Sequence, residues 1–182
     1  MNEVYDYDYW YNQTDTHHGN VFGYGPKYIH NRIIKEVVFQ LDLPKGKIVM
    51  LGSHRCYGLE LLCKHYGYDK VIGFDLYNPT KHKCVIITNF LHYNKSVNCA
   101  FVLNDIGSFE LTPKAKIHAQ KWAAKNTIKD GYVLGSTNGN RAGYKIEEDM
   151  TNNGFEIIKL TSFKTKNIPN WALENYVLYK KT

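Results

Sequence analysis

Short apolar runs that alternate with longer, helix-prone segments constrain the fold of this chain more than any other feature. Each run is about five residues long, too short for a helix, and nearly continuous in its hydrophobicity. That pattern is typical of strands covered on both faces of a sheet. The five runs lie at residues 47–51 (KIVML), 70–74 (KVIGF), 84–88 (CVIIT), 99–103 (CAFVL) and 131–136 (GYVLGS).

The segments around these runs have helical patterns. Residues 27–41 place Ile29, Ile33, Val37 and Leu41 four apart, which predicts an amphipathic helix ended by Pro44. Further helices are expected at residues 59–66, 113–127 and 144–153. Strand–helix alternation of this kind predicts an α/β sandwich with a mainly parallel sheet.

The end of the chain breaks the alternation. Residues 155–163 and 175–180 read as two strands joined by a polar connection without a helix, so we expect this pair to be antiparallel. Residues 1–25 are rich in Tyr, Asp, His and Gly without periodicity and predict an N-terminal arm or lid. The domain is therefore expected to span residues 26–182.

Length and composition fit one intracellular domain. The 182 residues, of which 43% are hydrophobic and 22% charged, suffice for one core. No apolar run approaches the roughly 18 residues that cross a bilayer, and residues 1–18 lack the apolar centre of a secretory signal. The four cysteines form no CxxC pair, which indicates free thiols in a reducing compartment and no metal site. We expect a cytoplasmic protein with no membrane partner.

The net charge of +6 suits an anionic partner, but the kinds and positions of the basic residues weaken that interpretation. The chain has 20 Lys and only 3 Arg, and the Lys residues are scattered. Recognition of bases and phosphates by paired hydrogen bonds favours Arg. A nucleic-acid partner therefore remains one possibility beside a small molecule.

Polar residues that follow the strands predict where a ligand binds, because ligands of open α/β sheets sit beyond the carboxyl ends of the strands. In chain order, these residues are Gly52, Ser53, His54 and Gly58; Asp75; Thr88, Asn89 and Phe90; Asn104 and Asp105; and Ser136 and Thr137.

The first two groups together indicate an adenosine-type ligand. The loop at Gly52 leads into a helix N-terminus, which favours an anion, and Gly58 allows either close helix packing or ligand approach. Asp75 follows Gly52 by 75 − 52 = 23 residues, where a carboxylate can bind the two ribose hydroxyls. The dinucleotide fingerprint GxGxxG and the phosphate loop GxxxxGK[ST] are both absent.

The chain resembles the class I S-adenosylmethionine-dependent methyltransferases. The resemblance rests on KIVMLGSHRCYG, VIGFDLY, VLNDIGSF and the ending FEIIKLTSF…NYVLYKK, and it covers residues 26–182 as an order of elements. It implies a three-layer sandwich around a mainly parallel, seven-stranded Rossmann-like sheet with an antiparallel C-terminal strand. It also implies S-adenosylmethionine as the cofactor, held by Gly52, Ser53, His54, Gly58, Asp75, Leu76, Asn89 and Phe90.

The same resemblance implies where methyl transfer occurs. Asn104 and Asp105 would face the transferred methyl group, with Asp105 as acid or base and Asn104 as an orienting hydrogen-bonder; a helix-capping role for Asp105 is the alternative. Tyr24 in the arm would close over the cofactor. The sequence N-D-I-G differs from the N/D-P-P-Y/F signature of exocyclic-amine methylation, so the methyl acceptor, a small molecule or a nucleic acid, stays open.

Two other functions compete. Met50 stands where the family usually has an acid, and His54 and Arg55 replace a denser glycine loop. These residues suit a non-catalytic, degenerate methyltransferase-fold scaffold or binding module. An enzyme of the same fold that performs another reaction on S-adenosylmethionine or a nucleotide is the third hypothesis.

Overall fold

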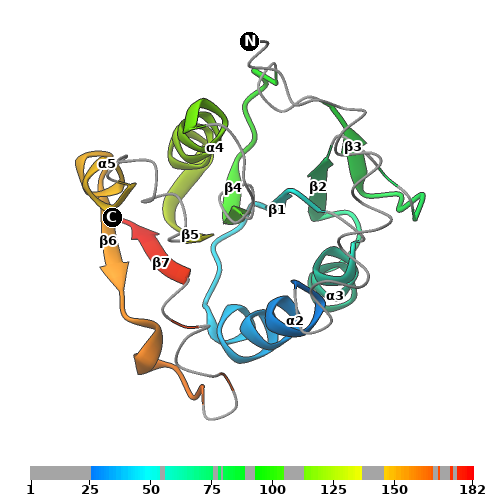
Figure 1. Cartoon of the computed structure of the whole chain (residues 1–182), viewed down its shortest axis with the longest axis horizontal. Coiled ribbons are helices and arrows are strands. Elements are labelled where there is room, and N and C mark those ends of the chain that lie inside the picture. The colour runs from blue at the N-terminus through cyan, green and yellow to red at the C-terminus, as the bar shows by residue number, and fades with distance from the viewer. Residues whose placement is uncertain are drawn as a thin grey trace.

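A single seven-stranded sheet with the strand order β3-β2-β1-β4-β5-β7-β6 organises the part of the chain that the structure describes. The computed structural model describes residues 26–53, 56–75, 78, 80–88, 93–104, 113–136, 146–165, 168, 173 and 176–182. Figure 1 shows the strands between two helical layers, with α2 and α3 on one face and α4 and α5 on the other. The expected three-layer α/β sandwich is confirmed.

The strands follow the apolar runs closely. They are β1 (Lys47–Leu51), β2 (Val71–Asp75), β3 (Val85–Ile87), β4 (Cys99–Asn104), β5 (Thr127–Ser136), β6 (Phe155–Ile158) and β7 (Tyr176–Lys181). Strands β1 to β5 pair in parallel, whereas β7 runs antiparallel to both β5 and β6. The antiparallel ending is thus confirmed, and β7 lies between β5 and β6.

The helices cover the sheet through their apolar faces. They are α2 (Pro26–Glu36), α3 (Tyr57–Tyr66), α4 (Pro113–Asn126) and α5 (Ile146–Asn152), with single 3-10 turns at η1 (Val38–Gln40) and η5 (Leu160–Ser162). The expected helix over 27–41 is therefore shorter, because the chain tightens into η1 after Val37. That turn keeps both Val37 and Val38 fully buried.

Two strands, β5 and β6, differ from the sequence-based boundaries by more than one residue. β5 begins at Thr127, earlier than expected; Lys129 and Asp130 are exposed and polar, so the apolar run did not reveal this part of the strand. The expected strand over 155–163 ends at Ile158, where the chain turns into η5 and buries Leu160. β5 therefore pairs beyond its apolar run, whereas β6 stops pairing although apolar residues follow it.

The core lies on both faces of the sheet. One cluster packs α2 and α3 against Met50, Phe101 and Leu134, and the other packs α4 and α5 against Val49 and Val102. Neighbouring residues of β1 and β4 therefore belong to opposite clusters, as strand geometry requires. Burial on both faces explains why these runs are continuously apolar.

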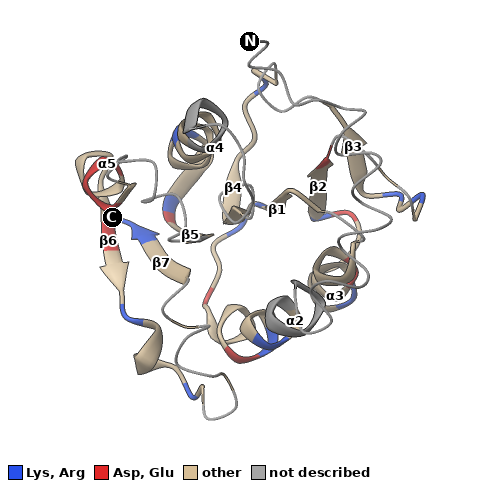
Figure 2. Ribbon diagram, in the orientation of Figure 1, with Lys and Arg blue, Asp and Glu red and all other residues tan. Residues whose placement is uncertain are grey.

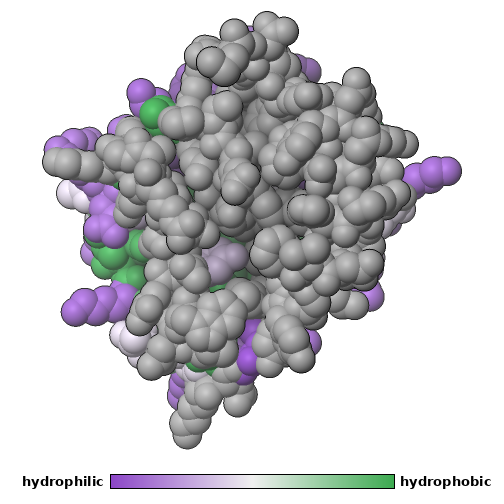
Figure 3. Space-filling view, in the orientation of Figure 1, coloured by the Kyte–Doolittle hydropathy of each residue, from purple (hydrophilic) through white to green (hydrophobic). Residues whose placement is uncertain are grey.

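The described surface carries charges of both signs without one dominant patch. Figure 2 shows Lys and Arg spread over helices, strands and loops, and a group of acidic residues on α5. In the same orientation, hydrophilic side chains occupy most of the described rim, with a small hydrophobic area beside β6 (Figure 3). Among the described residues, no helix is both long enough and apolar enough to cross a membrane.

Candidate functional site

The carboxyl ends of β2, β1 and β4 meet at the middle of the sheet. Leu51 of β1 pairs with Phe74 of β2 on one side and with Asn104 of β4 on the other. The chain leaves β1 through α3 toward β2, while β4 continues into α4 on the opposite face (Figure 1). This reversal makes the end of β1 the topological switch point, where ligands of open α/β sheets bind.

The turn after β1 folds back onto β2. Gly52 adopts the left-handed conformation with φ of 76°, and its N–H donates to the Phe74 carbonyl at 2.9 Å. The Ser53 N–H points at the same carbonyl at 3.3 Å. A side chain at residue 52 would be strained in this conformation, so the glycine is required by the turn.

Gly73 of β2 leaves the space into which the turn packs. A Cβ atom there would lie 2.7 Å from Leu59 Cδ2 and 3.1 Å from Ser53 Cβ. The first distance is shorter than carbon atoms tolerate. A glycine outside the predicted loop thus lets Ser53 and α3 approach the sheet, a role that the sequence reading missed.

Ser53 and Cys56 lie next to each other in the loop between β1 and α3. Ser53 is almost fully buried, and its carbonyl accepts a 2.7 Å hydrogen bond from the Cys56 N–H. The Ser53 hydroxyl faces the Cys56 thiol but makes no hydrogen bond of good geometry to the described residues. Burial raises the pKa of the Cys56 thiol, and the nearby Asp75 carboxylate adds to that rise. A thiol therefore lies close to the predicted ribose-binding carboxylate, which the sequence reading did not anticipate.

Asp75 ends β2 beside the Gly52 turn. Its carbonyl accepts a 2.8 Å hydrogen bond from the Thr88 N–H, which continues the pairing of β2 with β3. The side chain is partly exposed at this edge. The structure therefore brings together Gly52, Ser53 and Asp75, as the spacing predicts.

Gly58 serves the packing of α3. A Cβ atom at this position would lie 3.1 Å from Ile34 Cδ1 and 3.4 Å from Met50 Cε. Of the two roles expected for this glycine, close helix packing is the one that these distances support. Met50 is almost fully buried in the same apolar cluster.

Asn104, at the end of β4, forms a buried amide pair with Gln120 of α4. The Asn104 Nδ2 donates to Gln120 Oε1 at 3.2 Å, and the two residues are 4% and 2% exposed. Within the described part of the chain, Asn104 Oδ1 and Gln120 Nε2 have no hydrogen-bond partner. Exchanging the nitrogen and oxygen positions of both amides would still leave one donor and one acceptor without a partner among the described residues. The pair therefore leaves one buried donor and one buried acceptor without a described partner near the switch point.

Gln120 was not among the predicted site residues. The only sequence signal is its place between Ala119 and Ala123 on the small-residue face of α4, since that face is buried. A glutamine on such a face needs a polar partner, and Asn104 supplies it.

Ser136 ends β5, where its backbone is in register with Tyr176 of β7. The remaining predicted site residues lie outside the described residues. They are Tyr24, His54, Leu76, Asn89, Phe90, Asp105 and Thr137. Among the residues that the structure does describe, no group of three His, Cys, Asp or Glu side chains is arranged to hold a metal ion.

Comparison with known proteins supports the fold through structure alone. No family model matches the chain. No curated protein matches it either. Solved structures match over nearly the whole chain. The N-methyltransferase NodS of Bradyrhizobium japonicum, in complex with S-adenosyl-L-homocysteine, has a TM-score of 0.60 and 9% identity, with 96% of this chain and 97% of NodS covered.

Two further structures agree. A Haloferax volcanii protein in complex with the Trm112 methyltransferase activator has a TM-score of 0.59 and 13% identity, with 97% of each chain covered. Magnesium protoporphyrin IX methyltransferase of Synechocystis, with bound S-adenosylmethionine, has a TM-score of 0.53 and 11% identity, covering 86% of this chain and 79% of that one. The chain has the class I S-adenosylmethionine-dependent methyltransferase fold. The mostly parallel seven-stranded sheet with antiparallel C-terminal strands matches the fold of these neighbours.

Proposed function

We propose that this protein is an S-adenosylmethionine-dependent methyltransferase. The observation that carries the proposal is the meeting of the Gly52 turn with Asp75 at adjacent strand ends, at the switch point of a methyltransferase fold. Methyltransferases match this fold over nearly the whole chain, and two of them hold S-adenosylmethionine or S-adenosylhomocysteine. Because the sequence identity is low, the local chemistry of the site carries the most weight.

The described residues suit such a cofactor. The turn at Gly52 brings backbone rather than side chain to the edge of the sheet, and the partly exposed Asp75 carboxylate can accept hydrogen bonds from two ribose hydroxyls. Ser53, His54, Leu76, Asn89, Phe90 and Tyr24 complete the proposed cofactor-binding set. Gly58, also predicted for this set, would act through the close packing of α3. S-adenosylmethionine supplies a methyl group already activated on a sulfonium, so the protein needs mainly to align the acceptor and exclude water.

The acceptor is proposed to bind near the end of β4. The Asn104–Gln120 pair has one donor and one acceptor without a partner among the described residues, which favours an uncharged group that can both give and take a hydrogen bond. Asp105, the next residue, is proposed as the acid or base that takes a proton from the acceptor. A small molecule and a nucleic acid both satisfy this chemistry.

Calorimetric titration with S-adenosylmethionine and S-adenosylhomocysteine tests the cofactor, with NAD and ATP as controls. We expect micromolar binding of the first two alone. Asp75→Asn should weaken that binding at least about tenfold, because charge-assisted hydrogen bonds are worth about 1.5–3 kcal/mol each. The matched control is Asp42→Asn, an exposed aspartate between η1 and β1, which should bind like the wild type.

Absence of binding by the wild-type protein would favour the degenerate scaffold, in which Met50 replaces a cofactor-binding acid with core packing. Equal affinity of Asp75→Asn and wild type would instead remove Asp75 from the ribose site while leaving the cofactor in place.

A further inference from the structure

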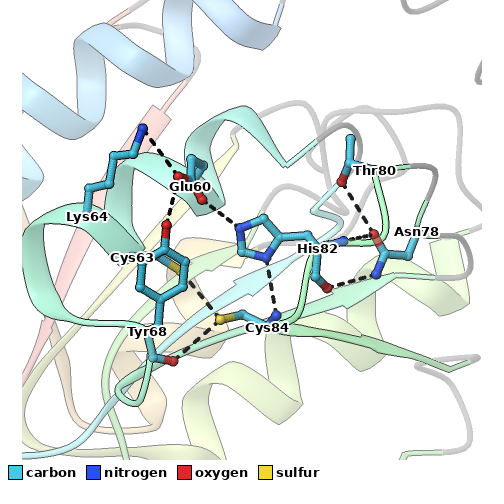
Figure 4. A network of polar contacts seen from close by, with 8 residues as sticks. All are labelled: Glu60, Cys63, Lys64, Tyr68, Asn78, Thr80, His82 and Cys84. Atoms are coloured by element: carbon cyan, nitrogen blue, oxygen red, sulfur yellow. Dashed lines mark hydrogen bonds and ion pairs between the residues drawn. The ribbon is translucent and has the colours of Figure 1, made fainter.

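Two thiols at the β3 edge of the sheet lie in contact. The Sγ atoms of Cys63, in α3, and Cys84, just before β3, are 3.7 Å apart (Figure 4). A disulfide needs about 2.05 Å between the sulfurs, so closing this gap requires a movement of less than about two ångströms. Both cysteines are free in the structure. The pair lies outside the cofactor and acceptor sites proposed above.

A polar network fixes Cys84 in this position. The Cys84 N–H donates to His82 Nδ1 at 3.2 Å, so His82 carries its proton on Nε2 and donates it to Glu60 Oε2 at 2.9 Å. Asn78 binds the backbone of His82 on both sides, through its amide nitrogen at 2.9 Å and its oxygen at 2.8 Å. Figure 4 shows these contacts between α3 and the segment that leads into β3.

The two thiols differ in access to solvent. Cys84 is partly exposed, whereas Cys63 is 1% exposed and packed in the core. Burial and the adjacent Cys84 raise the pKa of the Cys63 thiol to about 12. A dissolved oxidant therefore reaches Cys84 first, and Cys63 is the thiol positioned to resolve the product.

We propose that Cys63 and Cys84 form an oxidation site whose product is a disulfide between α3 and the start of β3. A peroxide is the oxidant. The Cys84 thiolate attacks one peroxide oxygen, the O–O bond breaks, and Cys84 becomes a sulfenic acid as the first water leaves. Cys63 sulfur then attacks the Cys84 sulfur, its proton leaves with the hydroxyl as the second water, and the S–S bond forms. Two thiols lose two electrons in total, and one hydrogen peroxide is reduced to two waters.

The cross-link fixes the segment between the two cysteines. This segment contains β2 and its terminal Asp75, so the disulfide restrains the backbone on which the proposed ribose carboxylate stands. Because the sulfurs are already in contact, the bond closes on the folded arrangement. The oxidised protein should therefore keep its fold, unfold at a higher temperature, and retain any cofactor affinity.

Peptide mapping of the oxidised full-length protein tests the site. The reduced chain is treated with hydrogen peroxide, its remaining thiols are alkylated, and the digest is analysed by mass spectrometry without reduction. We expect a Cys63–Cys84 cross-linked peptide as the main product. The melting temperature should rise by roughly 5–12 °C, since a disulfide removes entropy from the unfolded chain. Dithiothreitol should reverse both changes.

Variants separate this pair from the other thiols. Cys99→Ala, which changes a buried cysteine of β4, should cross-link as the wild type does, whereas Cys84→Ser should lose both the cross-link and the gain in melting temperature. A main product that joins Cys84 to Cys56, or a Cys84 sulfinic acid without a cross-link, would overturn the assignment. So would a lower melting temperature after oxidation.

Cofactor titration of both redox forms distinguishes this inference from the proposed function. If reduced protein does not bind S-adenosylmethionine, the proposed function fails while the mapped disulfide stands. If the reduced protein binds it and the oxidised protein does not, the bond distorts the Asp75 segment, and the claim that it closes on the folded arrangement is wrong.

Discussion

Single residues set how closely the turn after β1 approaches the sheet. Gly73 illustrates this, because its missing side chain is the space that Ser53 and Leu59 fill. Gly135 also lies in an interior strand, β5, but a Cβ atom added there would have its nearest described neighbours 3.9 Å away. Two glycines in similar strands thus face different packing.

Gly73→Ala should destabilise the protein by about 1–3 kcal/mol, because the new methyl group overpacks the turn. Urea unfolding followed by circular dichroism measures the change. Gly135→Ala is the matched control and should change the free energy of unfolding by less than about 1 kcal/mol. Equal decreases in the free energy of unfolding of the two variants would show that the residues around Gly73 move to accommodate the methyl group without destabilising the fold.

The two amides of the Asn104–Gln120 pair should contribute to stability together. Gln120→Leu or Asn104→Leu alone leaves the remaining buried amide without its partner and should cost about 1–3 kcal/mol. The double leucine variant removes all the polar groups of the pair, including the two that are unpaired among the described residues, and should recover most of that stability.

Urea unfolding of the wild type, the two single variants and the double variant forms a double-mutant cycle. If the losses of stability in the two single variants simply add in the double variant, the two amides are not coupled. If the pair also binds the methyl acceptor, the double variant should bind S-adenosylmethionine normally and turn over slowly. A double variant with full turnover would remove the pair from the acceptor site.

At the scale of elements, Glu60 connects α3 to the segment before β3. Its carboxylate accepts hydrogen bonds from Tyr68 and His82, and Lys64 lies 3.3 Å away. The bond from His82, followed by that from Tyr68, lowers the pKa of Glu60 to about 2 from the ordinary 4.5. These contacts therefore favour the ionised carboxylate in the folded protein.

Acid should weaken this connection. A lowered pKa stabilises the fold above pH 4.5, and that contribution is lost as the pH falls from 4.5 toward 2. The loss should be at most about 1 kcal/mol because the side chain is 36% exposed to water. Urea unfolding of wild type and Glu60→Gln between about pH 6 and pH 3 measures it.

The amide introduced by Glu60→Gln cannot ionise, so the stability of that variant should fall less steeply with acid than that of the wild type. Parallel pH profiles for the two proteins would mean that the carboxylate contributes nothing net to folding.

At the scale of the whole molecule, stability should fall from the centre of the sheet to its edges. Val49 of β1 and Val102 of β4 are fully buried, whereas Ile87 of β3 and Ile157 of β6 are 62% and 47% exposed. β1 and β4 also have paired strands on both sides, while β3 and β6 are the edge strands of the described sheet. Central strands therefore open only with the whole fold.

Hydrogen exchange followed by mass spectrometry checks this order. Peptides from β1 and β4 should exchange last, and those from β3 and β6 first. Oxidation of Cys63 and Cys84 should slow exchange most in β2 and β3, the strands that the cross-link restrains. Uniform protection of all strands would contradict the gradient.

Most of the fold was predictable because its signal is local. Apolar runs that are buried on both faces must be continuous, so strands β1, β2 and β4 follow their sequence signal closely. β5 and β6 were placed less well, since β5 pairs through the exposed polar residues Lys129 and Asp130, whereas β6 stops pairing although apolar residues such as Leu160 follow it. The meeting of Gly52 and Asp75 was predictable as well, because parallel strand ends align at one edge.

The sequence by itself determined the strand–helix alternation, the antiparallel ending and the strand-end residues, because each depends on local hydrophobicity and chain direction. Only the tertiary structure decided three contacts. Gln120 pairs with Asn104, and Gly73 leaves room for Ser53. Cys63 contacts Cys84. The physical reason is that these contacts join residues far apart in the chain. Their distances depend on how α3 and α4 pack against the sheet, which no local pattern encodes.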